Sequence, residues 1–166
     1  MVRPQIDRPV VPEGYGIEQA DAFVSWEFVQ DRLRESQNYW LSTTGATGSP
    51  HVVPRWGVWI KEMFWYDGSP ETLHARNAEL NPECALHLED GSSAVIVYGG
   101  STRSKPIDRD VGKTLSAEFR RKYSPTYEPG ASAWSGSDAG GLRVLRPRLA
   151  LAWTDFPKDV TRFRFD

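Results

Sequence analysis

Two hydrophobic periodicities alternate along the chain, and together they predict a mostly β protein with a few helices. Residues 25–35 carry apolar side chains at three- and four-residue spacing, which predicts a helix with Ser25 as its N-cap. Apolar residues recur at every fourth position over residues 110–123, with charged residues between them, so an amphipathic helix is predicted there as well. Most other apolar segments are short and rich in aromatic and β-branched residues, as is typical of strands.

The first group of predicted strands lies between residues 38 and 67. Aromatic and β-branched residues on both sides of "GATGSP" predict a β-hairpin over residues 38–60, and residues 61–67 predict a third strand. Pro54 cannot donate to a strand ladder, so it predicts an edge, a bulge or an exposed backbone at that point. A short helix is predicted from Thr72 to Leu80, because Pro82 disfavours helical geometry at the residue before it.

The second half of the chain adds further antiparallel strands. Residues 84–89 and 93–103 flank the turn signal Asp90-Gly91 and predict another hairpin, and residues 142–154 and 161–166 predict the last strands. Residues 124–141 are rich in Ser, Gly, Pro and Ala and predict a long mobile loop that covers a site. Residues 1–16 predict an extended arm that crosses the surface. The order of elements predicts a single mostly β domain, antiparallel and barrel-like, with flanking helices.

Composition and charge exclude several function classes. With 20 Lys and Arg against 22 Asp and Glu, the chain has no overall basic field that would attract nucleic acid or an anionic membrane. No segment approaches the ~20 apolar residues of a membrane span, and the N-terminal residues lack the apolar core of a signal peptide. Cys84 is the one cysteine, and the three histidines have no metal-ligand spacing, so we expect a soluble cytoplasmic protein without a metal site.

Seven tryptophans are a heavy load for 166 residues, and three of them, Trp56, Trp59 and Trp65, lie at strand-like positions. Two interpretations stay open: the rings fill a barrel or dimer core, or some of them stack on a ligand. Their number favours a large buried interface. We therefore expect Trp59 and its strand neighbours to be shielded by a second subunit.

The segment "GSPETLHARN", Gly68 to Asn77, carries the clearest functional signal. A glycine-containing polar turn directly before a helix start presents backbone N–H groups and the positive end of the helix dipole, which together hold phosphate groups. A phosphate-bearing cofactor is therefore the leading hypothesis. The alternative is that Thr72 is only an N-cap and Arg76 only a solvated surface residue.

The order of "YWLSTTGATGSPHVVPRWGVW", "FWYDGSPETLHARN", "NPECALHLEDG" and "VIVYG" resembles the pyridoxamine 5′-phosphate oxidase-like family of FMN-binding split β-barrel proteins. The C-terminal "RPRLALAWTDFPKDVTRFRF" is similar to its flavin- and deazaflavin-dependent oxidoreductase branch, so the resemblance covers residues 23–166. It implies an antiparallel split β-barrel of six to eight strands, with a short helix after the third strand. It also implies a homodimer with FMN, or alternatively the deazaflavin coenzyme F420, at the subunit interface.

The resemblance also implies which residues contact the cofactor. The family's phosphate motif is commonly Ser or Thr, then Arg, then Lys; this chain has Thr72, Leu73 and His74 there, and Arg76 and Asn77 are candidates to compensate. The strand that begins at His51 resembles the family's flavin-lining strand. The implied cofactor-binding residues are His51, Val52, Val53, Pro54, Arg55, Trp56, Gly68, Thr72, Leu73, His74, Arg76 and Asn77.

Three further residues are candidates near the cofactor or substrate: Trp134, Trp153 and Arg162. The last two, together with Arg164, loosely resemble a family tryptophan and arginine near the C-terminus. Arg162 is equally suited to an ion pair with a carboxylate at a dimer edge. His87 matches no family position, and we interpret it as structural.

The predicted function is a flavin-dependent oxidoreductase with a small-molecule substrate or electron donor. The cofactor performs the electron transfer in such proteins, which agrees with the lack of a Ser-His-Asp order, a paired-carboxylate motif, a P-loop or zinc spacing in this sequence. The catalytic residues and the substrate stay unknown. Two alternatives remain: a non-catalytic module that binds or stores flavin, deazaflavin or haem, and a structural dimer with a vestigial site.

Overall fold

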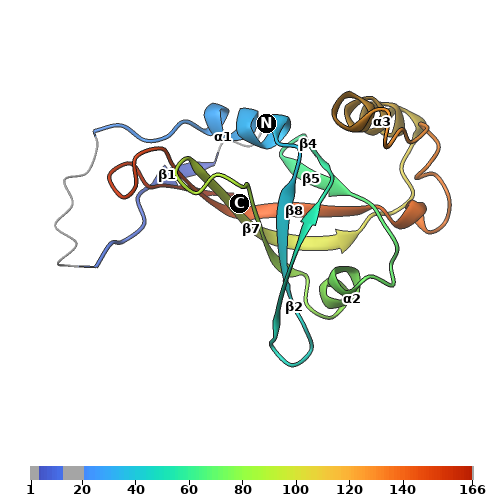
Figure 1. The fold of residues 1–166 in the computed structure, drawn as a ribbon, viewed down its shortest axis with the longest axis horizontal. Helices are drawn as coiled ribbons and strands as arrows, with labels where there is room; N and C mark the ends of the chain where they lie inside the picture. Colours follow the sequence, from blue (N-terminus) through green and yellow to red (C-terminus); the bar gives the residue numbers. More distant parts are fainter. Residues whose placement is uncertain (1–3, 13–20, 166) are drawn as a thin grey trace.

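A computed structural model describes residues 4–12 and 21–165 of the chain, and an antiparallel sheet of nine strands forms its centre (Figure 1). Seven strands follow the order β1-β9-β8-β7-β6-β2-β3, and the β4–β5 hairpin joins them where β5 pairs with β8. The sheet curls without closing, so the predicted mostly β, barrel-like class is confirmed. The strands are β1 (Gln5–Asp7), β2 (Tyr39–Thr44), β3 (Pro50–Arg55), β4 (Val58–Ile60), β5 (Met63–Tyr66), β6 (Glu83–His87), β7 (Ala94–Arg103), β8 (Arg143–Trp153) and β9 (Thr161–Arg164).

The three predicted helices are present and begin at capping residues. The first helix, α1 (Trp26–Glu35), has Ser25 as N-cap, whose side chain accepts a hydrogen bond from the Phe28 N–H. Helix α2 (Leu73–Leu80) follows Thr72 and ends before Asn81, as the position of Pro82 predicts. Helix α3 (Arg109–Tyr123) is capped by Asp108. None of the described helices is long and apolar enough to cross a bilayer.

The nine described strands exceed the predicted six to eight, because the N-terminal arm adds β1 and the strand expected over the second half of the first hairpin is divided. The strand is interrupted at Gly57, where an added Cβ atom would lie 2.3 Å from the Phe64 ring. A tight turn at Lys61 and Glu62, with φ angles of 51° and 61°, then closes the separate β4–β5 hairpin. Neither turn residue is Gly or Asn, so the sequence carried no turn signal there. Helix α2 consequently follows β5 and not the third strand.

The two edge strands of the sheet, β1 and β3, bear on two further predictions. The expected N-terminal arm contributes the strand β1, which pairs with β9, whereas its residues 1–3 and 13–16 lie outside the described ranges. At the other end of the strand order, β3 pairs only with β2. Pro54 therefore lies in an edge strand, which confirms the first of the three options that its position predicted.

Two hydrophobic clusters form the interior of the described chain. The larger one lies between α1 and the curled sheet, and the smaller one lies under α3. Trp59 belongs to the larger cluster: it is 4% exposed and meets Trp26 edge-on at a centroid distance of 6.3 Å. The expectation that a second subunit shields Trp59 is therefore wrong, because its own chain already buries it.

Residues 124–141 are a long connection, but a buried aromatic anchors them. Trp134 is 1% exposed and packs against Phe119 of α3 at a centroid distance of 5.6 Å. Residues 139–141 form a short turn with positive φ angles, and a Cβ on Gly141 would lie 2.1 Å from the Gly68 carbonyl oxygen. Residues 134 and 139–141 of the connection are thus packed against α3 and against the turn before α2, and the mobility of the loop stays a prediction.

Lys122 of α3 is buried and connects the helix to Gly57, where the strand is interrupted. The Lys122 ammonium donates to the Tyr39 hydroxyl at 2.6 Å and to the Gly57 carbonyl at 3.1 Å, and it forms no ion pair with a carboxylate of the described chain. Burial, with a contribution from the nearby Arg121 charge, lowers the pKa of Lys122 to about 7. The charged form is therefore disfavoured in the fold.

We predict that Lys122→Met stabilises the protein most at and below pH 7. Between pH 7 and 10.5 the unfolded chain holds a proton on Lys122 that the folded chain lacks, so wild-type stability rises with pH by at most about 1.4 kcal/mol per unit from this group. The substitution removes that slope, and its partners keep other bonds: Tyr39 still donates to the Leu33 carbonyl, and Gly57 still accepts from Tyr123. Urea unfolding at pH 6 and pH 9.5 measures the effect, with the exposed Lys113→Met as control.

Candidate functional site

The turn before α2 and the edge strand β3 lie side by side, as the phosphate hypothesis requires. Helix α2 packs on β2 and β3, and the Asn77 side-chain amide donates to the buried Thr43 hydroxyl at 3.1 Å. His51 pairs with Thr43 across the β2–β3 ladder, so its side chain lies on the same face of the sheet as α2. The predicted residues of β3 and α2 thus meet at one edge of the sheet.

Two hollows lie along this edge and divide the predicted residues between them. The first, which we term the α2 hollow, has a volume of about 450 Å³ and contains His51, Leu73, Arg76 and Asn77 among its lining residues. The second, the Trp56 hollow, has a volume of about 500 Å³, and its lining residues include Pro54, Arg55, Trp56, Gly68, Asp67 and Tyr127.

Strand alternation separates the remaining β3 residues. His51, Val53 and Arg55 are register partners of the buried β2 residues, whereas Val52 is 50% exposed on the outer face of the sheet. The Val52 side chain therefore does not point toward α2. Only the backbone of Val52 lies in a position that fits the predicted role.

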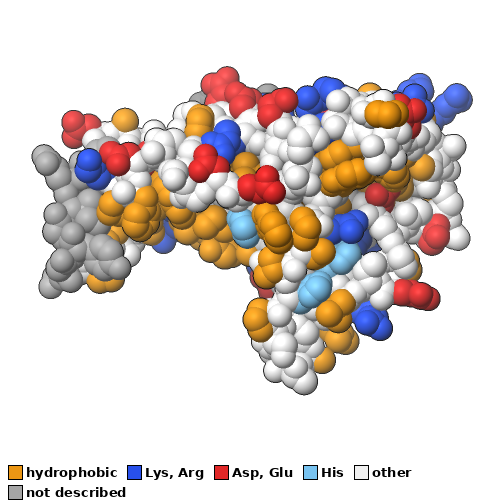
Figure 2. Space-filling model, in the orientation of Figure 1, with side chains coloured by type: hydrophobic (Ala, Val, Ile, Leu, Met, Phe, Trp, Pro, Cys, Tyr) orange, Lys and Arg blue, Asp and Glu red, His pale blue; other side chains and the backbone are white. Residues whose placement is uncertain are grey.

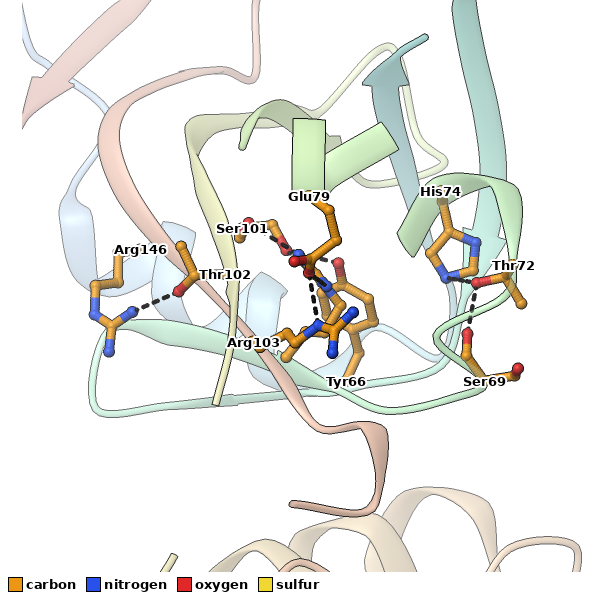
Figure 3. A network of polar contacts seen from close by, with 10 residues as sticks. Tyr66, Ser69, Thr72, His74, Glu79, Ser101, Thr102, Arg103 and Arg146 are labelled. Atoms are coloured by element: carbon orange, nitrogen blue, oxygen red, sulfur yellow. Dashed lines mark hydrogen bonds and ion pairs between the residues drawn. The ribbon is translucent and has the colours of Figure 1, made fainter. Parts of the chain in front are cut away.

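The helix start differs from the family's phosphate motif in two ways. Thr72 is the N-cap, but its hydroxyl does not cap the helix; it donates to the Ser69 carbonyl at 2.9 Å and lies 3.3 Å from His74 Nε2 (Figure 3). Leu73 is 48% exposed and places an apolar side chain beside the α2 hollow.

The charge state of His74 follows from its surroundings. The imidazole is 5% exposed, and burial, together with the positive charges of Arg55, His51 and Arg143, lowers its pKa to about 4. His74 is therefore neutral at neutral pH and does not replace a lysine. Burial is the largest cause of this shift, and the three basic neighbours add to it.

An ion-pair network that the sequence analysis missed fixes the far end of α2. The Glu79 carboxylate accepts hydrogen bonds from Arg143 of β8 at 2.5 Å and from Arg103 of β7 at 2.9 Å. Arg143 is 4% exposed and also donates to the Ser101 carbonyl, and the Ser101 hydroxyl bonds to Tyr66 at 2.7 Å (Figure 3). An arginine at an alternating position of a strand predicts an outward-facing side chain, so no sequence signal marked its burial.

A small cavity of about 50 Å³ lies between this network and the turn before α2. His74 and Tyr66 line it together with Arg103 and Arg143. Two arginines share one Glu79 carboxylate here, so the immediate network carries an excess of positive charge. Asp67 and Asp138 also line this cavity, so both carboxylates and guanidinium groups border it.

Asp67 organises the Trp56 hollow, and it too was missed. Its carboxylate accepts hydrogen bonds from the Tyr127 hydroxyl at 2.5 Å and from the Trp134 indole N–H at 2.8 Å, while its backbone carbonyl accepts from Arg55. The Arg55 Nε–H is buried without a partner in the described chain. Arg55 therefore has one buried donor without an acceptor in the described chain.

None of the three residues predicted near the cofactor or substrate lines either hollow. Trp134 supports Asp67 from the interior and does not line the hollow. Trp153 donates to the Gly91 carbonyl at 3.0 Å, in the part of the sheet away from α2. Arg162 forms a bidentate ion pair with Asp7 at 2.7 and 3.0 Å, within its own chain.

Solved structures share this fold across most of the chain. An F420 reductase matches with a TM-score of 0.54 and 21% identity over 84% of this chain and 98% of its own. A conserved hypothetical protein of Mycobacterium tuberculosis matches with a TM-score of 0.63 and 20% identity, over 86% and 91%. HutZ, the haem storage protein of Vibrio cholerae, matches with a TM-score of 0.53 and 22% identity, over 73% and 85%.

These likenesses establish the fold. The chain is a split β-barrel with flanking helices. No family model matches the sequence, and no curated protein matches it either. The split-barrel prediction is thus confirmed by structure, at identities too low to transfer a function.

We predict that Glu79→Ala lowers stability by about 2 kcal/mol or more, because it leaves the buried Arg143 guanidinium without its carboxylate. Removal of the other partner, Arg103→Ala, should cost less than about 1 kcal/mol, since that side chain is largely exposed. Urea unfolding of both variants measures the difference. Equal losses of stability would contradict the inference that the buried Arg143 depends on its ion pair with Glu79.

Proposed function

We propose that this protein is a flavin-dependent oxidoreductase of the pyridoxamine 5′-phosphate oxidase-like family, with FMN or the deazaflavin F420 as cofactor. The α2 hollow is lined by Arg76 and His51 and by no acidic residue of the described chain, so its field is positive, and this is the observation that carries the proposal. A phosphate group is the ligand that such a field and a helix N-terminus favour. The F420 reductase among the structural neighbours supports the deazaflavin option.

The donor set fits a phosphate-bearing cofactor without the usual arginine and lysine. Arg76 is exposed in the α2 hollow and has no ion pair within the described chain, so its guanidinium is available to an anion. His51 faces it from β3. Arg55, whose Nε–H is buried without a partner in the described chain, lines the adjacent hollow and adds a guanidinium for a polar edge of the cofactor.

When bound, the flavin or deazaflavin supplies hydride or electron transfer, and the chain's own residues bind and shield it. Trp56 is 42% exposed and stacks on Tyr123 at a centroid distance of 4.8 Å, so a rigid aromatic wall borders the second hollow. Asp67, held by Tyr127 and Trp134, keeps the turn before α2 in place. These residues orient a ligand; none of them is assigned a proton transfer.

The outer face of the sheet supports a homodimer. Its side chains form two rows of register partners that cross four strands, and hydrophobic side chains gather along the sheet below α1 (Figure 2). No described element covers the centre of these rows, where Tyr98 is 40% exposed. The first row consists of Trp40, His87, Ile96 and Leu151, and the second of Ser42, Ala85, Tyr98 and Leu149.

A second copy of the chain is the occupant we propose for this face. An exposed apolar sheet face is unusual for a monomer, and two copies that share it would place both β3 edges near the interface. Arg162, Arg164 and Asp7 form an ion cluster at the β9 end of the rows, where a polar rim is expected.

We predict that Tyr98→Arg converts a dimer into a folded monomer, because it places a charge at the centre of the apolar rows. Sedimentation equilibrium should give about twice the chain mass of 18.7 kDa for the wild type and the single-chain mass for the variant. The exposed Ala117→Arg on α3 is the charge-matched control and should stay dimeric. A wild type that sediments as a monomer at high concentration contradicts the proposal.

Haem binding is the alternative function, and one observation favours it. His87 lies on the outer face, stacked on Trp40 at an interplanar angle of 8°. Its Nδ1 lies 2.9 Å from the Leu88 carbonyl oxygen, which can only accept, so Nδ1 carries the proton and the Nε2 lone pair is free in the neutral ring. An apolar face with one such histidine suits a haem iron, and HutZ is a haem storage protein of this fold.

The cofactor proposal is tested by titrating the protein separately with FMN, F420 and haemin. We predict that Arg76→Ala and His51→Ala each weaken flavin or deazaflavin binding by about tenfold or more, while Arg120→Ala on the exposed side of α3 leaves it unchanged. The bound cofactor should then be reduced by a nicotinamide donor or exchange electrons with reduced deazaflavin.

Two outcomes would contradict the proposal of a flavin-dependent oxidoreductase. Haemin binding that is lost in His87→Ala, with no affinity for either flavin, would establish the haem alternative. A flavin that binds but exchanges electrons with no donor would make the protein a binding module. NMR of His74 gives an independent reading, since a phosphate bound beside it must raise the imidazole pKa above about 4.

A further inference from the structure

A third hollow, larger than the two at the edge of β3, lies between the β4–β5 hairpin and the first turns of α3. We term it the α3 hollow. Its volume is about 900 Å³, and the segment 102–108 and Arg146 of β8 complete its wall. Small-molecule sites typically span about 300–1,000 Å³. Neither the predicted cofactor residues nor the proposed dimer rows lie in this hollow.

The inner surface of the α3 hollow is apolar. Ile60 and Trp65 line it from the hairpin, and Val111 lines it from α3. All three are half-buried and pack against the smaller hydrophobic cluster, so their inner sides are supported while their outer sides face the hollow. Met63 adds a flexible and polarisable side chain next to Trp65. This surface suits the hydrocarbon or aromatic body of a ligand.

Strand alternation separates the α3 hollow from the cofactor site. Met63 and Trp65 alternate along β5 with Phe64 and Tyr66, which are 0% and 1% exposed in the core. Tyr66 lines the small cavity beside His74, on the other face of the strand. Strand β5 therefore lies between a ligand in the α3 hollow and His74, and Arg103 is the side chain that borders both cavities.

The rim of the α3 hollow carries an excess of positive charge. Lys61 and Lys105 form no ion pair within the described chain, and Arg146 donates only to the Thr102 hydroxyl, at 3.2 Å (Figure 3). The two acidic residues of the rim are already engaged. Asp108 caps α3, and Asp110 pairs with Lys113 at 3.1 Å.

We propose that the α3 hollow binds a small amphipathic carboxylate, with its apolar body against Trp65 and its carboxylate at the lysines of the rim. The apolar inner surface accounts for the body, and the unpaired cations account for the charge of the head group. An uncharged ligand would leave both lysines without a partner, and a purely polar anion would leave the apolar surface in water.

Decanoate is the probe for this site, and decan-1-ol is its uncharged counterpart. Calorimetric titration should show decanoate binding, accompanied by a change in tryptophan fluorescence that is lost in Trp65→Phe. The double substitution Lys61→Glu/Lys105→Glu should weaken decanoate binding by about tenfold or more and leave decan-1-ol binding within about threefold. Thr114→Trp, an exposed lining position on α3, should fill the hollow and abolish both.

The control is Arg120→Glu, which changes a charge on α3 outside the hollow and should leave decanoate affinity unchanged. Circular dichroism verifies that each variant is folded. Decanoate binding that survives both Thr114→Trp and the double substitution would place the ligand elsewhere and overturn the proposal, as would no binding in the wild type. Flavin binding is unaffected by these substitutions if the two sites are separate, so each proposal fails on its own measurement.

Discussion

The close approach of Gly57 to the Phe64 ring is the constraint on which the rest of the architecture depends. A side chain at this position has no space, so the strand that began as β3 ends there and the chain turns into the β4–β5 hairpin. The hairpin then pairs with β8 and returns the chain to the edge of β3 through α2. Lys122 and Tyr123 both bond to the Gly57 carbonyl, so α3 is fastened at the same point. All three hollows border elements that this break positions.

Sequence patterns correctly predicted the features of the fold that depend on one residue and its immediate neighbours. The capping of α1 by Ser25, the end of α2 before Pro82 and the edge position of Pro54 each follow from a single residue and its neighbours. The division of a predicted strand did not, because it results from contact between Gly57 and a ring seven positions away, and from a turn at Lys61 and Glu62 that lacks the usual turn residues. Those contacts exist only in the folded chain.

The candidate site shows the same limit. The sequence indicated that β3 and the start of α2 belong together, and the structure places His51, Arg76 and Asn77 around one hollow. The sequence did not indicate that Arg143 is buried or that it converges with Arg103 on Glu79, because these contacts join segments far apart in the chain. Whether a histidine such as His74 is charged depends on burial and on charges brought in by tertiary contacts. A motif therefore locates an anion site more readily than it defines its ligand.

The edge strand β3 carries prolines at both position 50 and position 54. These positions have the same parity, so the two missing N–H groups belong to the same side of the strand, and prolines in sheets place that side toward solvent. A foreign strand that approached this edge would find few donors for a ladder. The strand that borders the candidate cofactor site can thus remain uncovered without acting as a template for intermolecular sheet growth and aggregation.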